Sequence, residues 1–246
     1  MIRIDDYEQL KIRIVNWISD YCWKYNIKAL VVGVSGGIDS AVVSTLCAET
    51  GLPVYALGMP IHQDKEQESL SDAHLDWLDN KYKNVNIIKI DLTNTFDTFK
   101  YDLERYATNK LALANTRARL RMVTLYQIAG SMGGIVAGTG NKVEDYGIGF
   151  FTKYGDGGVD IAPIADLYKS EVWELGEYLG VDERICDAIP TDGLWDDGRC
   201  DEDQIGATYE QLEEAMEYKR GIALNTLEEY NNKNKHKMEP IPTFKL

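Results

Sequence analysis

Several short stretches of the sequence place glycines beside hydroxyl, carboxylate or ammonium side chains, the groups that bind phosphates and metal ions. The clearest is Ser35-Gly-Gly-Ile-Asp-Ser40, which follows the apolar run Ala29-Leu-Val-Val-Gly-Val34. Glycines after a buried strand let the backbone turn tightly, and serine hydroxyls and helix-opening amides donate to an anion. The segment lacks the lysine of Gly-x-x-x-x-Gly-Lys-Ser/Thr and the spacing of Gly-x-Gly-x-x-Gly. It predicts a phosphate-binding turn of another kind, with an ordinary strand-to-helix turn capped by Asp39 as the alternative.

The hydrophobic pattern predicts the elements that must position this turn. Apolar residues at intervals of three and four between Tyr7 and Tyr21 indicate an opening helix that ends near Asn26. Short runs that are apolar on both sides predict parallel strands at residues 29–34, 53–58, 85–90 and 134–138. Helical patterns lie between these runs, at residues 39–49, 66–79, 95–108 and 115–129. Such alternation builds right-handed βαβ units, so the predicted fold class is α/β, a doubly wound, mostly parallel sheet.

The predicted sheet brings two motifs together. Ligands of such sheets bind at the carboxyl ends of the strands, where the turn at residues 35–40 and the segment Gly138-Thr-Gly-Asn-Lys142 both lie. Residues 140–160 and 190–204 are weakly patterned, and loops of this length are more often functional than connecting. We therefore expect both loops to close over a ligand.

The rest of the chain reads as a helical C-terminal region. Helical patterns cover residues 161–188 and 205–235. Neither an internal repeat nor a linker interrupts the sequence, so residues 1–246 are predicted to form a single domain.

Composition and charge exclude several classes of protein. The 246 residues carry 26 Lys and Arg against 40 Asp and Glu, a net charge of −14. Nucleic acids and anionic membranes call for a basic face, so neither is an expected partner. No membrane-spanning run and no signal-peptide pattern is found, and we expect a cytoplasmic protein. The cysteines and histidines lack the spacing of a structural zinc site; they are Cys22, Cys47, Cys186, Cys200, His62, His74 and His236.

The turn and the segments that follow it carry a family resemblance. Ser-Gly-Gly-x-Asp-Ser resembles the loop of the ATP pyrophosphatase superfamily, whose members cleave ATP to AMP and pyrophosphate to activate a substrate. Later segments resemble, in order, the signatures of NAD synthetases. They are Asn115-Thr-Arg-Ala-Arg-Leu-Arg-Met122, Gly138-Thr-Gly-Asn-Lys-Val-Glu144, Gly149-Phe-Phe-Thr-Lys-Tyr-Gly-Asp-Gly-Gly-Val-Asp160, Leu167-Tyr-Lys169, Pro190-Thr-Asp-Gly-Leu-Trp195, Asp201-Glu-Asp-Gln-Ile-Gly206 and His236-Lys237. The resemblance spans nearly the whole chain and implies the adenine nucleotide alpha hydrolase-like form of the predicted fold.

The resemblance implies an ammonia-dependent NAD synthetase, a carbon–nitrogen ligase that uses Mg²⁺, ATP, deamido-NAD and ammonia. Making an amide from a carboxylate requires a leaving group better than hydroxide, and adenylylation supplies AMP. Glutamine-using relatives resemble this domain fused to a nitrilase-like glutaminase with a Glu-Lys-Cys triad. None of the cysteines here has such a context, so free ammonia is expected, while a separate glutaminase subunit stays an open alternative. Family members are typically homodimers, and we expect the same here.

The resemblance also implies a set of site residues. The expected ATP-binding residues are Gly33, Val34, Ser35, Gly36, Gly37, Ile38, Asp39, Ser40, Thr139, Lys169 and Thr191. The expected deamido-NAD-binding residues are Arg119, Lys153, Asp160, His236 and Lys237. Asp39 and Glu144 are expected to bind Mg²⁺, which takes carboxylate oxygens together with water and phosphates. The expected catalytic residues are Asp39, Lys169 and Asp160, with Asp160 as the candidate general base.

Each assignment has an alternative. Asp39 could cap a helix, Glu144 could be a solvated loop carboxylate, and Lys169 a surface lysine. Met238 follows His236-Lys237 where the family often has arginine, which leaves one cationic contact open. Another ATP pyrophosphatase, such as a GMP synthetase subunit or a tRNA-modifying enzyme, would keep the turn and change the acceptor. A nucleotide-binding sensor without catalysis is the third hypothesis, although the catalytic side chains are present.

Overall fold

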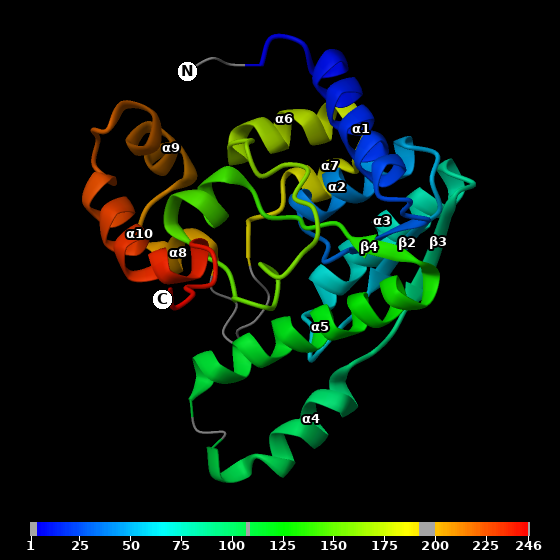
Figure 1. The fold of residues 1–246 in the computed structure, drawn as a ribbon. Coiled ribbons are helices and arrows are strands. Elements are labelled where there is room, and N and C mark those ends of the chain that lie inside the picture. Colours follow the sequence, from blue (N-terminus) through cyan, green and yellow to red (C-terminus); the bar gives the residue numbers. More distant parts are fainter. Residues whose placement is uncertain (1–3, 107–108, 192–199, 246) are drawn as a thin grey trace.

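A four-stranded parallel sheet forms the centre of the protein, in a computed structural model that describes residues 4–106, 109–191 and 200–245. The strand order is β3-β2-β1-β4. The strands are β1 (Ala29–Gly33), β2 (Val54–Gly58), β3 (Val85–Lys89) and β4 (Gly134–Val136). Leu30 of β1 pairs with Val54 on one side and with Ile135 on the other. Both faces are covered by helices (Figure 1), so the predicted doubly wound α/β fold is confirmed.

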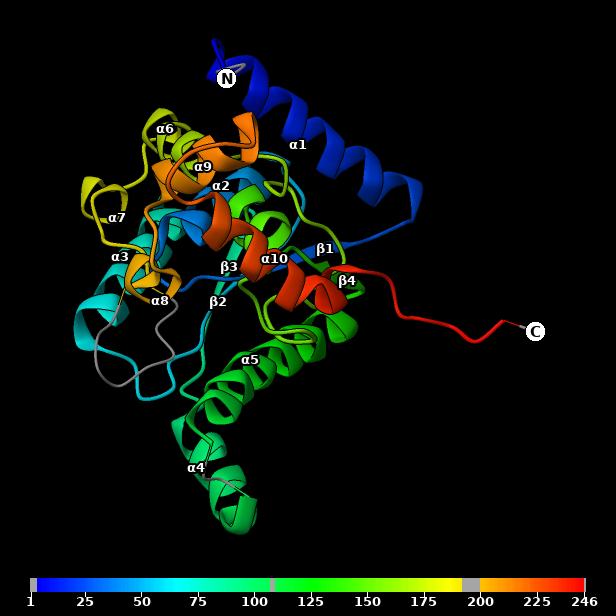
Figure 2. The same cartoon turned by 90° about the vertical axis from the view of Figure 1, so that its left-hand side faces the viewer.

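The helices fall into an N-terminal set that belongs to the sheet and a C-terminal set. The first set is α1 (Tyr7–Lys24), α2 (Ile38–Glu49), α3 (Lys65–Lys81), α4 (Thr93–Asp102), the short η1 (Glu104–Tyr106) and α5 (Lys110–Met132). The second is the π-helix η2 (Lys142–Ile148), α6 (Lys169–Leu179), α7 (Glu183–Cys186), α8 (Asp201–Ile205), α9 (Tyr209–Tyr218) and α10 (Leu224–Met238). In Figures 1 and 2, α4 and the start of α5 extend away from the rest of the molecule.

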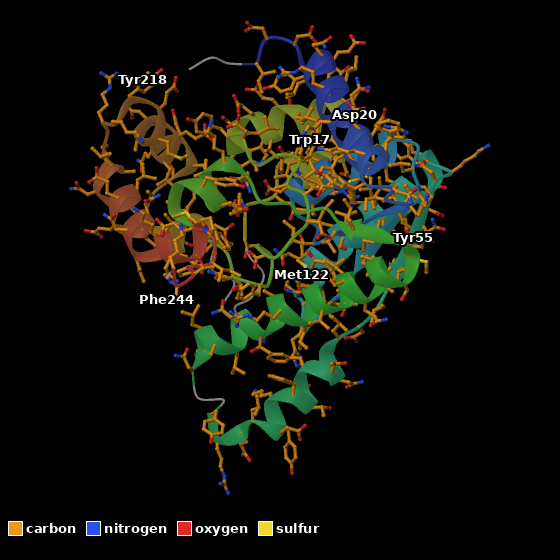
Figure 3. All side chains as sticks on the ribbon, in the orientation of Figure 1. Trp17, Asp20, Tyr55, Met122, Tyr218 and Phe244 are labelled. Carbon is orange, nitrogen blue, oxygen red and sulfur yellow. The ribbon has the colours of Figure 1, made fainter. Side chains whose placement is uncertain are left out.

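Alternation along β1 explains why this strand is apolar on both sides. Leu30 and Val32 pack with α1, α2, α3 and α6 in one hydrophobic core, while Val31 packs with α5 in a second. Met122 lies on the side of α5 that packs into this second core (Figure 3). A strand that buries side chains on both faces needs no polar positions, because neither face meets water. Its carboxyl end then delivers the chain to the turn at residues 35–40.

The C-terminal helices form a third core that reaches back to the sheet. Apolar residues of η2, α8, α9 and α10 pack together, among them Ile148, Tyr209 and Leu212. Trp173 of α6 contacts both this cluster and the first core. The C-terminal region therefore lies against the element that follows β4.

The helix predicted for residues 161–188 is partly wrong. Ile161 forms a parallel bridge with Ala137, and α6 begins only at Lys169. Ile161, Ile164 and Leu167 have helical spacing, but they bury their side chains in the first core from irregular backbone. Their spacing therefore reflects burial and not a helix.

Both predicted loops also contain regular structure. Residues 140–160 include η2, and α8 begins at Asp201 within the second predicted loop. The helices predicted at residues 205–235 correspond to α9 and α10, which are separated where Lys219 and Gly221 have φ values of +52° and +110°. Residues 192–199 of the second predicted lid lie outside the described part of the chain. Within that part, none of the helices is both long enough and apolar enough to cross a bilayer.

Candidate functional site

One large cavity, of about 1870 Å³, lies at the carboxyl ends of the strands. The turn after β1, the chain after β4 and the start of α6 all contribute to its wall. Nearly all of the residues that the sequence singled out meet here. Those in its lining are Gly33, Val34, Ser35, Gly36, Gly37, Ile38, Asp39, Ser40, Arg119, Thr139, Glu144, Lys153, Lys169, Thr191, His236 and Lys237.

The turn at residues 35–40 is held open by its own hydrogen bonds. The Ser40 hydroxyl donates to the Gly37 carbonyl at 2.9 Å and accepts from the Ser35 amide at 3.1 Å. Gly36 has a φ of +91°, and a Cβ there would lie 2.6 Å from the carbonyl oxygen of Gln67 in α3. Only glycine fits both the dihedral angle and the space. Gly37 precedes α2, so the free amides of that helix face the cavity and suit an anion.

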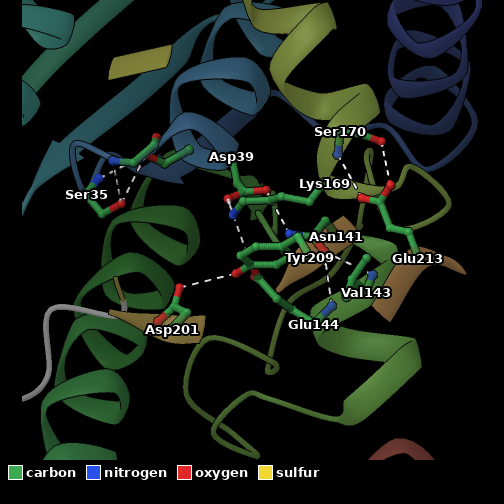
Figure 4. A network of polar contacts seen from close by, with 12 residues as sticks. Ser35, Asp39, Asn141, Val143, Glu144, Lys169, Ser170, Asp201, Tyr209 and Glu213 are labelled. Atoms are coloured by element: carbon green, nitrogen blue, oxygen red, sulfur yellow. Dashed lines mark hydrogen bonds and ion pairs between the residues drawn. The ribbon is translucent and has the colours of Figure 1, made fainter. Parts of the chain in front are cut away.

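A cluster of three charged residues, the buried Lys169 and the partly buried Asp39 and Glu144, lies beside the turn (Figure 4). We call these three residues the ion cluster. Lys169 Nζ donates to Asp39 Oδ2 at 2.6 Å and to Glu144 Oε1 at 2.9 Å. The Lys169 side chain is only 3% exposed, so it is not a surface lysine. Asp39 is the second residue of α2 and turns its carboxylate to Lys169, so it does not cap the helix.

Electrostatic interactions favour the charged forms of Lys169 and Glu144 in the ion cluster. Burial alone would lower the pKa of Lys169, but the carboxylates of Asp39 and Glu144 raise it above the ordinary lysine value. Burial opposes ionisation of Glu144 as well, yet Lys169 and the Tyr209 hydroxyl together lower the pKa of that carboxyl. For Asp39, burial prevails over Lys169 and raises the pKa. The cluster carries one positive and two negative charges when ionised, which leaves it ready to receive a further cation.

The carboxylates of the ion cluster suit a magnesium ion. Both carboxylates bind the same atom, Lys169 Nζ, so their oxygens lie near enough to share a cation. Among the residues that the structure describes, no group of three or more His, Cys, Asp or Glu side chains could hold a metal by itself. Mg²⁺ commonly uses one or two carboxylates together with water and substrate phosphates, and the anion-binding turn beside Asp39 would bring those phosphates. The donor set fits this ion.

Two further residues hold the ion cluster and were missed by sequence reasoning. Asn141, fully buried, donates from Nδ2 to Asp39 Oδ1 at 3.0 Å and accepts from the amides of Val143 and Glu144. The Tyr209 hydroxyl donates to Glu144 Oε1 at 2.7 Å. Asn141 lies within the motif Gly138-Thr-Gly-Asn-Lys142, which was a usable signal. Nothing in the local sequence distinguishes Tyr209 from the other tyrosines.

Three cationic residues and a histidine gather on another part of the cavity wall. These residues, which we call the cation group, are Arg119, Lys153, His236 and Lys237. Arg119 Nε donates to the Lys153 carbonyl at 3.2 Å, and Lys153 Nζ donates to the His236 carbonyl at 3.1 Å. Lys237 Nζ donates to the carbonyls of Gly149 and Phe151, and burial lowers its pKa. Within an acidic chain, this convergence of cations from α5, the loop after η2 and α10 suits an anionic ligand.

Asp160 is not part of this cavity. Its Oδ2 accepts from the Val136 amide at 2.8 Å, and it contacts the Tyr126 hydroxyl, so it supports the end of β4. Asp156 lines the cavity instead and accepts from the Thr152 amide at 3.1 Å. Desolvation by the surrounding protein, together with the negative charge of Glu144, raises the pKa of Asp156 to about 6. The residue is nevertheless exposed, and it lines the cavity. The sequence motif contains both aspartates, and only the folded loop decides which one lines the cavity.

Comparisons with known proteins identify the family of the chain. The model of the family described as NAD synthase matches residues 10–242. A protein of Carboxydothermus hydrogenoformans named NH(3)-dependent NAD(+) synthetase is 38% identical over 239 residues, which are 94% of this chain and 95% of that protein. The solved structure of NMN synthetase from Francisella tularensis superposes with a TM-score of 0.91 at 35% identity, over 99% of this chain and 100% of the other. An NH3-dependent NAD synthetase from Campylobacter jejuni has a TM-score of 0.79 at 26% identity, over 98% and 100%.

Proposed function

Because the chain belongs to the NAD synthase family, we propose that it is an ammonia-dependent NAD synthetase. A carboxylate oxygen of the nicotinate in deamido-NAD attacks the α-phosphorus of ATP, and pyrophosphate leaves. Ammonia then attacks the acyl carbon, AMP leaves with that oxygen, and loss of a proton from nitrogen gives NAD. The observation that carries the proposal is the meeting of the turn at residues 35–40, the ion cluster and the cation group in one cavity.

We propose that the ATP phosphates bind at the turn. The amides at the start of α2 and the Ser35 hydroxyl, which is exposed to the cavity, donate to phosphate oxygens. Lys169 supplies an ammonium group, and Thr139 and Thr191 contribute hydroxyls from the cavity lining. Pyrophosphate gains negative charge as it leaves, so fixed donors at this place lower the barrier.

Asp39 and Glu144 would hold Mg²⁺. When bound, the ion supplies positive charge that stabilises the phosphate oxygens during transfer. The other residues of the cluster and its surroundings orient these carboxylates, because Lys169 keeps the two together and Asn141 sets the position of Asp39.

The acceptor would bind at the cation group. Its diphosphate and carboxylate are anions whose charge Arg119, Lys153 and Lys237 can neutralise, with His236 beside them in the cavity lining. Asp156 is better placed than Asp160 to accept the proton that ammonium loses, because only Asp156 lines the cavity. A carboxylate with a pKa of about 6 is a suitable base near neutral pH.

We further propose a single domain that acts as a cytoplasmic homodimer and uses free ammonia. The outer faces of α1 and α5 expose large apolar side chains, including Trp17, Val123 and Tyr126, which suit a second copy of the chain.

The alternative source of nitrogen is glutamine, with ammonia delivered by a separate glutaminase subunit. NAD formation with glutamine plus a cell extract, but not with glutamine alone, would favour this alternative.

One observation favours a second acceptor. The Francisella tularensis protein with a TM-score of 0.91 is described as an NMN synthetase. Nicotinate mononucleotide carries the same reacting carboxylate as deamido-NAD and lacks the adenylate half. The same chemistry on this smaller acceptor would give NMN.

Amide formation with each acceptor tests these proposals. Purified protein receives Mg²⁺, ATP and ammonium with either deamido-NAD or nicotinate mononucleotide, and kcat/KM is measured for each. We expect the larger value for deamido-NAD and loss of product with Asp39→Ala. A larger value for the mononucleotide would assign NMN synthesis, and no amide from either acceptor would refute both.

A further inference from the structure

Helix α9 presents two buried polar side chains, Tyr209 toward Glu144 of the ion cluster and Glu213 toward Ser170. Residues four apart lie on one face of a helix, and these two are 2% and 3% exposed. The Tyr209 hydroxyl donates to Glu144 Oε1 at 2.7 Å. Glu213 accepts from the Ser170 amide at 2.9 Å and from the Ser170 hydroxyl at 2.6 Å (Figure 4). One face of α9 therefore touches two separate supports of the site.

The contact with Ser170 fixes the start of the helix that carries Lys169. Lys169 and Ser170 are the first two residues of α6, whose N-terminal amides have no partner within the helix. The carboxylate of Glu213 binds one of these amides and lies at the positive end of the helix dipole. The backbone from which Lys169 reaches Asp39 and Glu144 is thereby held from α9.

Helix α9 is itself firmly anchored. Leu212 and Ala215 are fully buried in the third core, and Trp173 packs edge-on against the ring of Tyr209 at 5.9 Å. Thr208 caps the helix through a reciprocal pair of contacts with Gln211. The two polar contacts therefore come from a rigid element, about 6 Å apart along the helix axis.

Packing alone does not account for these side chains. A phenylalanine at position 209 would keep the contact with Trp173, and a neutral residue could fill the space of Glu213. A buried hydroxyl or carboxylate costs free energy unless its hydrogen bonds are made, and here both bond to the supports of the site. Their polar atoms act on Glu144 and on the start of α6.

We propose that Tyr209 and Glu213 are positioning residues, and that α9 sets the separation of Glu144 and Lys169. Tyr209 acts through Glu144, and Glu213 acts through Ser170 on Lys169. The inference rests on the proposed function, since that function gives the geometry of the ion cluster its catalytic purpose. Residues that orient a metal ligand typically change metal affinity or activity by about 10–100-fold when replaced.

The first test is Tyr209→Phe, which removes only the hydroxyl. Binding of Mn²⁺ with ATP, in the absence of acceptor, is measured by electron paramagnetic resonance. We expect its affinity and kcat to fall by about 10–100-fold, while KM for the acceptor stays within about twofold. Tyr82→Phe is the matched control, because the Tyr82 hydroxyl makes an equivalent bond of 2.6 Å to Glu49 outside the cavity. That control should bind and react like the wild type.

The second test asks whether Tyr209 acts through Glu144. In a Glu144→Gln background, Tyr209→Phe should cause no further loss of Mn²⁺·ATP affinity, because the contact that it serves is already changed. Wild-type affinity in Tyr209→Phe, or an equal loss in both backgrounds, would overturn the role of Tyr209. Glu144→Gln with unchanged affinity would overturn it too, since Glu144 would then not serve the metal.

The third test distinguishes the effect of Glu213 from that of a glutamate elsewhere on α9. Glu213→Gln should lower kcat by about tenfold with KM for the acceptor unchanged, whereas Glu210→Gln, on the exposed face of α9, should not. Equal kcat in both variants would overturn the role of Glu213. The Mn²⁺ measurement needs no acceptor, so a wild type that makes neither amide but shows the Tyr209 effect would refute the proposed reaction and leave the positioning role standing.

Discussion

Asn141 donates a hydrogen bond of 3.0 Å to Asp39 across 102 positions of the chain. The same side chain accepts from the amides of Val143 and Glu144, at the start of η2. One buried amide therefore connects the turn after β1 to the segment after β4, because it holds the carboxylate of Asp39 and the backbone that carries Glu144.

Replacement of Asn141 by aspartate should uncouple these segments. The variant keeps the oxygen that accepts from the η2 amides but loses the donor to Asp39 and adds a repelling charge. We expect kcat to fall by about 10–100-fold, because the proposed metal ligand loses its orienting partner. Steady-state kinetics measure the change. Asn84→Asp is the control, since the Asn84 side chain donates to the carbonyls of Ala48 and Leu52, away from the cavity; the variant should lose stability and keep its kcat.

Gly36→Ala should damage the phosphate-binding turn. The new Cβ would approach the Gln67 carbonyl to 2.6 Å at a φ of +91°, so the turn or α3 must move. We expect KM for ATP to rise at least about tenfold and the free energy of unfolding to fall by about 1–3 kcal/mol. Kinetics and urea unfolding give both values. In Gly180→Ala the φ is +77° with open space around it, so stability alone should change; a similar rise of KM for ATP there would contradict the steric argument.

Asp156 and Asp160 should differ in their effects. If Asp156 accepts a proton, activity rises as pH passes its pKa of about 6, because only the ionised carboxylate is a base. Asp156→Asn should lower kcat/KM for ammonium by about 10²-fold or more and remove that acidic limb of the pH profile. Asp160→Asn should keep the profile and lower the melting temperature, since it weakens the contact with the Val136 amide. The opposite assignment of these effects would restore Asp160 as the base.

His74 should make the fold less stable in acid. Its imidazole is 1% exposed and bonds the Ser44 hydroxyl, and burial lowers its pKa from 6.5 to about 4. The imidazole of the unfolded chain therefore takes up a proton below pH 6.5, whereas that of the folded chain stays neutral down to about pH 4. Stability contributed by neutral His74 is present above pH 6.5 and falls by about 3 kcal/mol toward pH 4.

Urea unfolding of His74→Gln between pH 8 and pH 4 measures this contribution. The variant should be less stable at pH 8 and lose less stability than the wild type on acidification. His62→Gln is the control, because His62 is exposed and pairs with Asp97 at the surface. Parallel pH curves for the wild type and His74→Gln would show that His74 does not titrate as its burial implies.

The sequence alone determined the sheet, the turn and the family. The strands β1 and β2 are buried on both faces. Their continuous apolar runs can be recognised from neighbouring residues alone, without knowledge of distant contacts. The glycines of residues 35–40 act through local dihedral angles, so the turn could also be recognised in advance. Hydrophobic periodicity gave a wrong prediction where buried residues had helical spacing without a helix. Ile161 and Ile164 are such residues, because they pack into the first core from irregular backbone.

Only the tertiary structure decided how the site is held together. Lys169 meets Asp39 across 130 positions and Tyr209 meets Glu144 across 65, contacts for which no local pattern exists. Asp156 and Asp160 are alike in type and close in sequence, and the path of the loop after η2 turned one to the cavity and the other to β4. Short-range steric preferences and hydrophobic spacing depend on residues that are close in sequence. Charge pairing at a site depends instead on which distant segments the core brings within hydrogen-bonding distance.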